Sequence, residues 1–219
     1  MDASFHYAML GFGESFFSAF AVVLKANIIE LGLLGSLPQA LGSVSQLFSE
    51  KLLKMFNSRK KFVCVNAFLQ ALMYIPIALV FYFGTFKVYH LILFVSLYFI
   101  FGMIASSAWS SWIGDLVNGS ERGSYFGRRN TIAGFVSFIT LLIAGYVLQH
   151  FTGDSKTQYI GFAIIFMLAL LFRIISFSYL ARKYEPKYIA PKDDGIGFVS
   201  FVRGALSKNY GVYIVYLCL

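Results

Sequence analysis

The fold is decided by an uncharged run at residues 88–114, which reads VYHLILFVSLYFIFGMIASSAWSSWIG. A helix rises about 1.5 Å per residue, so about 20 apolar residues cross the ~30 Å hydrocarbon core of a bilayer. The run exceeds that length, and Lys87 and Asp115 close it on either side. It therefore predicts a membrane-spanning helix.

Five further apolar runs predict spans in the same way, at residues 3–24, 31–49, 62–86, 130–153 and 157–181. Three of them are interrupted, by Glu14, by Pro38 with three glycines, and by Arg173. Proline and glycine are tolerated in transmembrane helices because neighbouring helices and water satisfy the freed backbone groups. The predicted fold class is all-α, a polytopic membrane protein with six transmembrane helices.

The composition excludes a water-soluble domain. Hydrophobic residues make up 58% of the chain and charged residues 13%, whereas soluble domains carry about 45–50% and about 25%. The same balance excludes intrinsic disorder. The two cysteines, Cys64 and Cys218, lie in apolar runs and form neither a disulfide framework nor a metal-ligand set.

The net charge of +8 is unevenly distributed along the chain. Most of the 18 basic residues follow the second, fourth and sixth spans, at Lys51, Lys54, Arg59, Lys60, Lys61, Arg122, Arg128, Arg129, Arg182, Lys183, Lys187, Lys192, Arg203 and Lys208. Because cytoplasmic loops are enriched in Lys and Arg, this pattern predicts a cytoplasmic N-terminus in a plasma (inner) membrane. The predicted partner of these charges is the anionic lipid headgroup rather than nucleic acid.

The spans also predict the domain organisation. Residues 1–181 form the transmembrane bundle, residues 182–208 a basic cytoplasmic linker, and residues 209–219 the start of a seventh, truncated span. The last run is too short to cross a bilayer, so we expect the chain to be a fragment of a longer protein. A half-size unit that pairs with a second copy is the alternative.

Two loops carry a recognisable pattern. Residues 109–130 read WSSWIGDLVNGSERGSYFGRRN, and residues 46–61 read QLFSEKLLKMFNSRKK. The first resembles the loop between helices four and five in a bacterial branch of the major facilitator superfamily, where D-L-V…R-G-x-Y-F-G-x-R recurs. The second resembles a degenerate form of the signature between helices two and three, with Gln46 in place of the leading glycine. The chain thus resembles the N-terminal six-helix half of such a transporter.

This resemblance implies a secondary active transporter that moves a small solute by alternating access, coupled to protons or another ion. It implies either a C-terminal half or a second copy as partner, and it implies no enzymatic activity. We expect no cofactor and no metal, because nucleotide-binding, hydrolase and zinc-protease signatures are missing from the sequence. The alternative is a six-span assembly or scaffold protein that transports nothing. The sequence does not identify the substrate.

Charged residues at the ends of the second and fourth spans are candidates for a cytoplasmic gate. Such a gate needs ion pairs that form in one state and break in the other. The candidates are Glu50, Lys51, Asp115, Arg122 and Arg128. The alternative is that these charges only set topology at solvated helix ends, where an exposed pair contributes about 0–1 kcal/mol.

Glu14 is the candidate for proton coupling, because a carboxylate at mid-bilayer is unfavourable unless it is protonated, paired or facing water. The alternatives are a structural hydrogen bond and an ion pair with Arg173, which could instead snorkel to the cytoplasmic surface. The resemblance places the first and fourth spans beside the central cavity, so Ser107 and Trp109 are candidate lining residues. The small side chains of residues 102–111 also suit close helix packing.

Overall fold

The computed structural model describes residues 2–186. The chain divides into two compact units, Met1–Tyr188 and Ile189–Leu219, and the described residues all belong to the first. Nearly all of the predicted linker, and the whole predicted start of a seventh span, lie outside the described residues. The domain boundaries proposed from the sequence therefore stay predictions.

The described part of the chain is helical and contains no strand. In chain order its elements are α1 (Asp2–Phe12), the 3₁₀ turn η1 (Glu14–Phe16), α2 (Phe17–Val23), α3 (Ile28–Gln46), α4 (Ser49–Phe56), α5 (Arg59–Leu72), α6 (Tyr74–Leu79), η2 (Val80–Tyr82), η3 (Gly84–Phe86), α7 (Lys87–Leu116), α8 (Arg122–Gln149) and α9 (Ser155–Ala181). The all-α fold class is thus confirmed.

Polar residues fix where several of these helices begin. Asn27 accepts from the amide of Glu30, whose carboxylate in turn accepts from the amide of Asn27, which forms a capping box at α3. Ser58 caps α5 through the amide of Lys61. Asp154 caps α9, and hydrogen bonds from the hydroxyl and amide of Thr157 lower the pKa of its carboxyl. These caps satisfy amides that have no partner within the helix.

Five helical segments are long and apolar enough to cross a membrane, at Ile28–Gln46, Arg59–Tyr82, Gly84–Leu116, Arg122–Gln149 and Ser155–Ala181. They correspond to the second to sixth predicted spans. The segment Arg59–Tyr82 is interrupted after Leu72, where α5 ends. Pro76 explains this, because a proline has no amide hydrogen and crowds the carbonyl four residues before it.

The first predicted span is not one continuous helix, so the count of six spans is not confirmed. Residues 2–23 form α1, then η1, then α2, with Gly13 at the break. A side chain at Gly13 would collide with the ring of Tyr74, whose Cζ lies 2.6 Å from the position of a Cβ. The backbone therefore bends where Tyr74 packs against it, and Glu14 begins the irregular turn.

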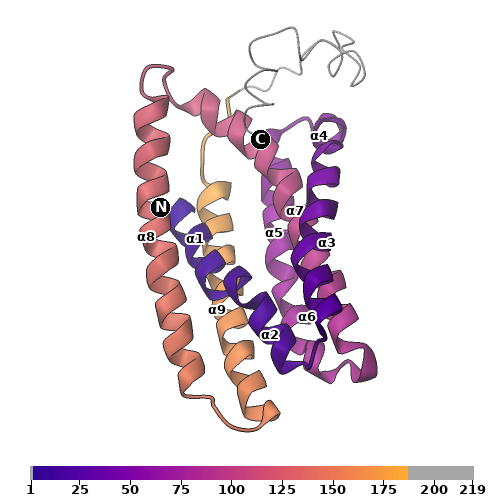
Figure 1. Cartoon of the computed structure of the whole chain (residues 1–219). Coiled ribbons are helices and arrows are strands. Elements are labelled where there is room, and N and C mark those ends of the chain that lie inside the picture. The colour runs from indigo at the N-terminus through magenta and orange to yellow at the C-terminus, as the bar shows by residue number, and fades with distance from the viewer. Residues whose placement is uncertain (1, 187–219) are drawn as a thin grey trace, which may run out of the picture. The chain divides into compact units, whose positions relative to one another are not determined.

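The broken helix lies obliquely between two groups of helices (Figure 1). α1 packs against α8 and α9, whereas α2 contacts α3, α7 and α9. On the other side, α7 packs against both α3 and α5, and α5 also contacts α9. Aromatic rings fill the centre of this arrangement, among them Phe17, Phe20, Tyr74, Tyr98 and Phe166. The first segment of the chain therefore joins the two groups.

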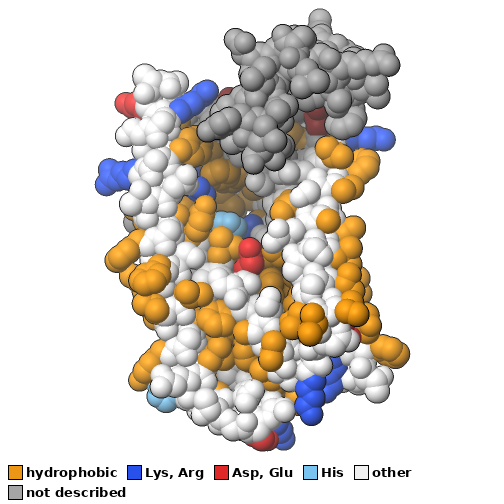
Figure 2. Space-filling view, viewed as in Figure 1, with side chains coloured by type: hydrophobic (Ala, Val, Ile, Leu, Met, Phe, Trp, Pro, Cys, Tyr) orange, Lys and Arg blue, Asp and Glu red, His pale blue; other side chains and the backbone are white. Residues whose placement is uncertain are grey.

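α3 and α8 are the least covered of the long helices. Only 17% of the most apolar stretch of each is buried, against 44% or more for the other three segments. Figure 2 shows the molecule hollowed between these two helices, with acidic and histidine side chains on the floor of the hollow. The apolar rims face outward, where lipid or another bundle would cover them.

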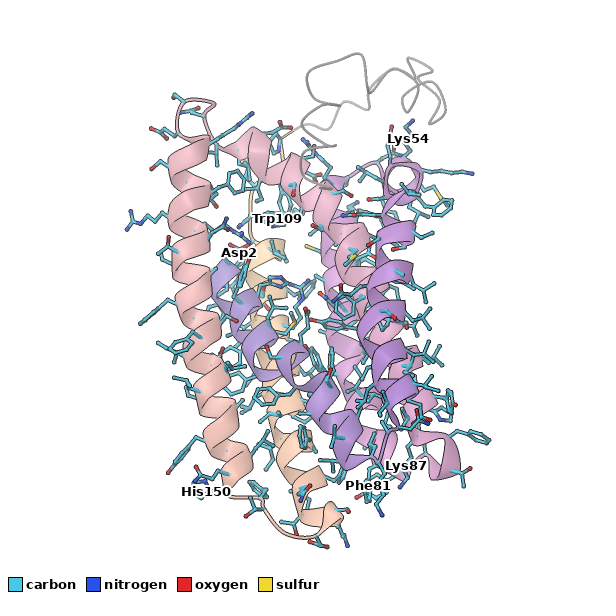
Figure 3. The ribbon with its side chains drawn as sticks, viewed as in Figure 1. Asp2, Lys54, Phe81, Lys87, Trp109 and His150 are labelled. Atoms are coloured by element: carbon cyan, nitrogen blue, oxygen red, sulfur yellow. The ribbon has the colours of Figure 1, made fainter. Side chains whose placement is uncertain are left out.

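The two ends of the bundle differ in charge. One end carries the turn from α3 to α5, the loop from α7 to α8 and the C-terminus of α9, and most of the described Lys and Arg residues lie in these segments. We call it the basic end. Figure 3 shows Lys54 at this end, with Asp2 and Trp109 on the same side of the bundle and Lys87 and His150 at the opposite end.

Gly11 provides a test of the packing, because α1 approaches α8 there. A Cβ on Gly11 would lie 2.6 Å from the backbone oxygen of Ser137, which cannot move aside, and would also meet Thr140. We expect Gly11→Ala to lower the free energy of unfolding by about 1–3 kcal/mol through overpacking. Thermal unfolding of the purified protein in detergent measures this.

Gly32→Ala is the matched control, since nothing lies within 4 Å of the added Cβ on that exposed helix face. It should leave the unfolding midpoint unchanged or slightly raised, because alanine favours helix. Equal midpoints for the two variants would contradict the close approach of α1 and α8.

Candidate functional site

A cavity of about 190 Å³ lies between α1, α5, α7, α8 and α9, toward the basic end. The side chains with polar or aromatic groups that line it include Asp2, His6, Tyr7, Trp109, Arg129 and Arg173. Figure 3 labels two of them, Asp2 at the start of α1 and Trp109 on α7. The cavity therefore brings together charges from three helices inside an apolar bundle.

Arg173 lies at the bottom of this charge cluster and is only 5% exposed. Its Nη1 donates to Nδ1 of His6 at 2.9 Å, so His6 is neutral there and carries its hydrogen on Nε2. The ion pair between Arg173 and Glu14, one of the alternatives raised from the sequence, is not formed in the structure, and the guanidinium does not reach the surface. The reason is that α1 presents His6, not Glu14, to this part of α9.

Glu14 lies at the break between α1 and α2. Its Oε2 accepts a hydrogen bond from the hydroxyl of Tyr98 at 3.0 Å, and Tyr98 is fully buried. A second cavity, of about 340 Å³, adjoins the carboxyl and is lined by hydroxyl and amide side chains that include Ser18, Gln39 and Ser137. The carboxyl thus combines one buried donor with a polar space beside it.

The small residues of α7 divide between packing and the cavity. Ser107 does not line the first cavity: its hydroxyl is 2.7 Å from that of Ser49, and Ser49 also donates to the carbonyl of Ile104 at 2.8 Å. Trp109 does line the cavity, and so does Ser106, a neighbour of Ser107 in the stretch of small residues that the sequence predicts either for helix packing or for the cavity. Neighbouring side chains on a helix point about 100° apart. Ser106 therefore faces the cavity while Ser107 faces Ser49.

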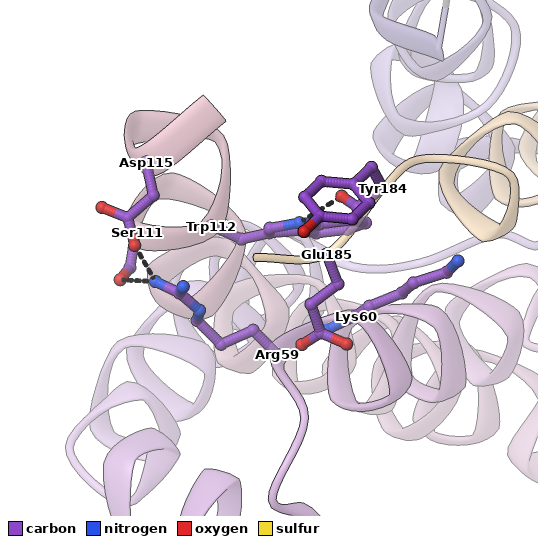
Figure 4. Close-up of polar contacts among 7 residues, drawn as sticks. All are labelled: Arg59, Lys60, Ser111, Trp112, Asp115, Tyr184 and Glu185. Atoms are coloured by element: carbon purple, nitrogen blue, oxygen red, sulfur yellow. Dashed lines mark hydrogen bonds and ion pairs between the residues drawn. The ribbon is translucent and has the colours of Figure 1, made fainter. Parts of the chain in front are cut away.

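A polar cluster at the basic end joins α5 to α7 (Figure 4). Nη1 of the buried Arg59 donates to Oδ2 of Asp115 at 2.6 Å and to the hydroxyl of Ser111 at 2.9 Å. Ser111 and Asp115 are four residues apart and share one face of α7. Asp115 is thus in an ion pair, as a gate residue requires, and its partner Arg59 was not among the gate candidates.

The segment after α9 adds to the same cluster. The carboxylate of Glu185 accepts from the amide of Lys60 at 3.0 Å and from the hydroxyl of Ser58 at 2.7 Å. A carboxylate at the start of a helix is favourable because it meets unpaired amides and the positive end of the helix dipole. Nε1 of Trp112 donates to the carbonyl of Tyr184 at 3.1 Å. The end of the bundle is thereby tied across α5, α7 and α9.

The other gate candidates do not meet one another. Glu50 pairs with Lys54 within α4, at 3.3 Å, rather than with Lys51. Nε of Arg122 donates to the carbonyl of Val117 at 3.2 Å, in its own loop. Lys51 and Arg128 are exposed and form no ion pair within residues 2–186. The spacing of the gate candidates along the chain does not show which helix ends are neighbours in the fold.

Four residues that line or support these sites were not among the site residues proposed from the sequence, namely Asp2, His6, Arg59 and Arg129, although Arg129 is the last arginine of the pattern R-G-x-Y-F-G-x-R. Each lies within a few residues of an expected span boundary, where a charged residue is expected only to set the membrane topology. Over the described part of the chain no group of three His, Cys, Asp or Glu side chains is placed to hold a metal. The side chains that line the first cavity include charged, aromatic and hydroxyl groups.

The pair of Arg59 and Asp115 can be tested against the exposed pair in α4. We expect Asp115→Asn to lower the free energy of unfolding by about 1–2 kcal/mol, since it replaces the carboxylate that accepts a hydrogen bond from the buried guanidinium of Arg59 by a neutral amide. Glu50→Gln should change it by less than about 0.5 kcal/mol, because Glu50 is exposed and one turn from its partner. Thermal unfolding in detergent compares the two, and equal losses would contradict this ranking.

Comparison with known proteins identifies the family of the chain. The family model of the Major Facilitator Superfamily matches residues 3–219, which include the polar cluster at the basic end and, apart from Asp2, the residues that line the two cavities. Neither a curated protein nor a solved structure matches the chain. The resemblance inferred from the two loops is thus confirmed, and the chain belongs to the major facilitator superfamily.

Proposed function

We propose that the protein supplies the N-terminal, cavity-forming helices of a proton-coupled secondary transporter that moves a small solute by alternating access. Members of the superfamily are transporters rather than enzymes, and the bundle has the long apolar helices of a multi-pass membrane protein. The observation that carries the coupling proposal is the position of Glu14. It lies at a helix break, bonded to Tyr98 and beside a polar cavity.

Irregular backbone at membrane depth is tolerated where it lines a cavity or is buried in protein. Discontinuous helices of this kind form the ion and substrate sites of many transporters. Glu14 begins the irregular turn, and the hydroxyl of Ser15 donates a hydrogen bond to the carbonyl oxygen of Leu10 at 3.1 Å. A carboxyl held this way can be stable both protonated and ionised, because Tyr98 donates to either form and water can enter beside it.

The cluster at the basic end is the proposed gate. Arg59 and Asp115 join α5 to α7, and Glu185 holds the segment after α9 onto the start of α5. These contacts are exchangeable for water, because Asp115 is half exposed. Opening of this end would break them, and closing would form them again, as rocking of one bundle against another requires.

The basic end is proposed to face the cytoplasm of a plasma membrane, where its charges would meet anionic headgroups. The uncovered faces of α3 and α8 are proposed to receive a second six-helix half, or a second copy of the chain. Under this proposal α1, η1 and α2 together form the first of six spans.

Orientation can be tested by cysteine labelling in a background with Cys64 and Cys218 replaced by serine. Ser120 lies in the loop at the basic end, and Ser155 begins α9 at the opposite end; both are exposed. We expect Ser120→Cys to react with an impermeant thiol reagent only from the cytoplasmic side, and Ser155→Cys only from outside. The reverse pattern, or labelling of both from one side, would overturn the topology.

Coupling can be tested in proteoliposomes loaded with a pH-sensitive dye. A panel of small solutes is added outside, and a solute that enters with protons acidifies the lumen. Glu14→Gln keeps the size of the side chain but fixes it as neutral. We expect it to abolish the acidification while retaining exchange of the labelled solute at equal pH on both sides.

The control for this experiment is Glu121→Gln, which removes an exposed carboxylate from the loop between α7 and α8 and lines neither cavity. Its acidification should match that of the unmodified protein. Full acidification by the Glu14 variant would remove this residue from the coupling mechanism and leave it a structural partner of Tyr98.

A further inference from the structure

Two guanidinium groups line the cavity between α1, α5, α7, α8 and α9, one from α8 and one from α9. Neither Arg129 nor Arg173 forms an ion pair with a carboxylate within residues 2–186. Positive charge inside an apolar bundle is unfavourable unless it is compensated. The cavity thus holds charge that the described chain does not neutralise.

The buried guanidinium of Arg173 has donors to spare. Its partner His6 is a neutral acceptor and supplies no negative charge. The Nε of Arg173 is buried, and among the residues that the structure describes it has no hydrogen-bond partner. A buried donor left unbonded is unfavourable in a protein that works alone, and it is expected where a ligand completes the site.

The guanidinium of Arg129 is held by stacking. Its Cζ lies 4.4 Å from the ring centre of Trp109 and 5.6 Å from that of Tyr7. A guanidinium bound through its face keeps the N–H groups at its edge available. Its Nη1 donates a long hydrogen bond to the amide oxygen of Asn130, at 3.3 Å. The rings therefore orient Arg129 without using up its donors.

The remaining charges around the cavity do not cancel these two. Asp2 lines the cavity, but its Oδ1 is 2.9 Å from Nζ of Lys183, so this carboxylate already has a cation. Glu14 lines the second cavity and is bonded to Tyr98. Because Asp2 is paired with Lys183, its negative charge does not offset the positive charges of Arg129 and Arg173 in the cavity.

We propose that this cavity binds the oxyanion group, carboxylate or phosphate, of a small anionic solute, with Arg129 and Arg173 as its ligands. Guanidinium edges match both groups in shape and charge. A volume of about 190 Å³ corresponds to roughly six water molecules at about 30 Å³ each, which suits a solute of a few carbon atoms. That the bound anion is also the transported one rests on the proposed function.

The test measures binding rather than transport. The midpoint of thermal unfolding of the full chain in detergent is followed against succinate, acetate, inorganic phosphate and sulfate, with ionic strength kept constant by sodium chloride. Neutral succinamide controls for the carbon skeleton. We expect an oxyanion to raise the midpoint by about 3 °C or more at saturation, since a ligand that binds only the folded state stabilises it, while succinamide leaves it unchanged. The relative strength of the carboxylates and phosphate identifies the class of solute.

Three variants locate the site. Arg129→Gln and Arg173→Gln should each weaken the apparent affinity at least about tenfold. Arg128→Gln removes the same charge from the neighbouring, exposed position, which does not line the cavity, and should behave as the unmodified protein. If Arg173→Gln fails to fold, Arg129→Gln decides, because Arg129 lies at the edge of the bundle and contributes no buried hydrogen bond.

Stabilisation by no oxyanion, or an unchanged response in Arg129→Gln, would overturn the proposal. Because the measurement needs no membrane, it separates this inference from the proposed function. Anion binding without transport in proteoliposomes would leave the site standing and remove the transport proposal. Transport without anion binding would support the transport proposal and overturn the proposed anion site.

Discussion

A charge inside the hydrocarbon layer must find its partner within the protein, because lipid offers neither hydrogen bonds nor counter-ions. The structure meets part of this constraint with short-range pairs that join different helices, whereas Arg129 and Arg173 form no ion pair with a carboxylate within residues 2–186. The pairs are His6 with Arg173, Glu14 with Tyr98, and Arg59 with Asp115. Each pair therefore fixes the relative position of two helices while keeping an ionisable group inside or at the end of the bundle, where a transport cycle can use it.

The packing of the first segment follows from the same constraint. α1 lies so close to α8 that only glycine fits at position 11, and the chain then bends at Gly13 against the ring of Tyr74. This bend is what places His6 and Glu14 on different cavities, one toward the basic end and one beside α3 and Tyr98. A straight helix over residues 3–24 would place Glu14 two turns beyond His6 with no irregular backbone to line a cavity.

The sequence was sufficient for the apolar runs, the all-helical class and the family, because span length and loop motifs are local properties. It also identified Glu14 and Asp115 as charges in unusual places. It could not supply the partners: Arg59 reads as one more basic loop residue until α5 is packed on α7, and His6 is unremarkable until α1 meets α9. The break in the first span was also hidden, since it depends on the ring of Tyr74 from a distant part of the chain.

The proposed function requires the hollow between α3 and α8 to be a water-filled path and not a lipid-facing surface. Its most direct measurement compares Ser106→Cys, on α7 in the first cavity, with Leu171→Cys, on the outer face of α9; both positions are exposed in the bundle. In membrane vesicles, with Cys64 and Cys218 replaced, a charged thiol reagent should modify Ser106→Cys rapidly and Leu171→Cys hardly at all. Equal, slow modification of both would show that no aqueous cavity reaches the centre of the bundle, and would contradict the account.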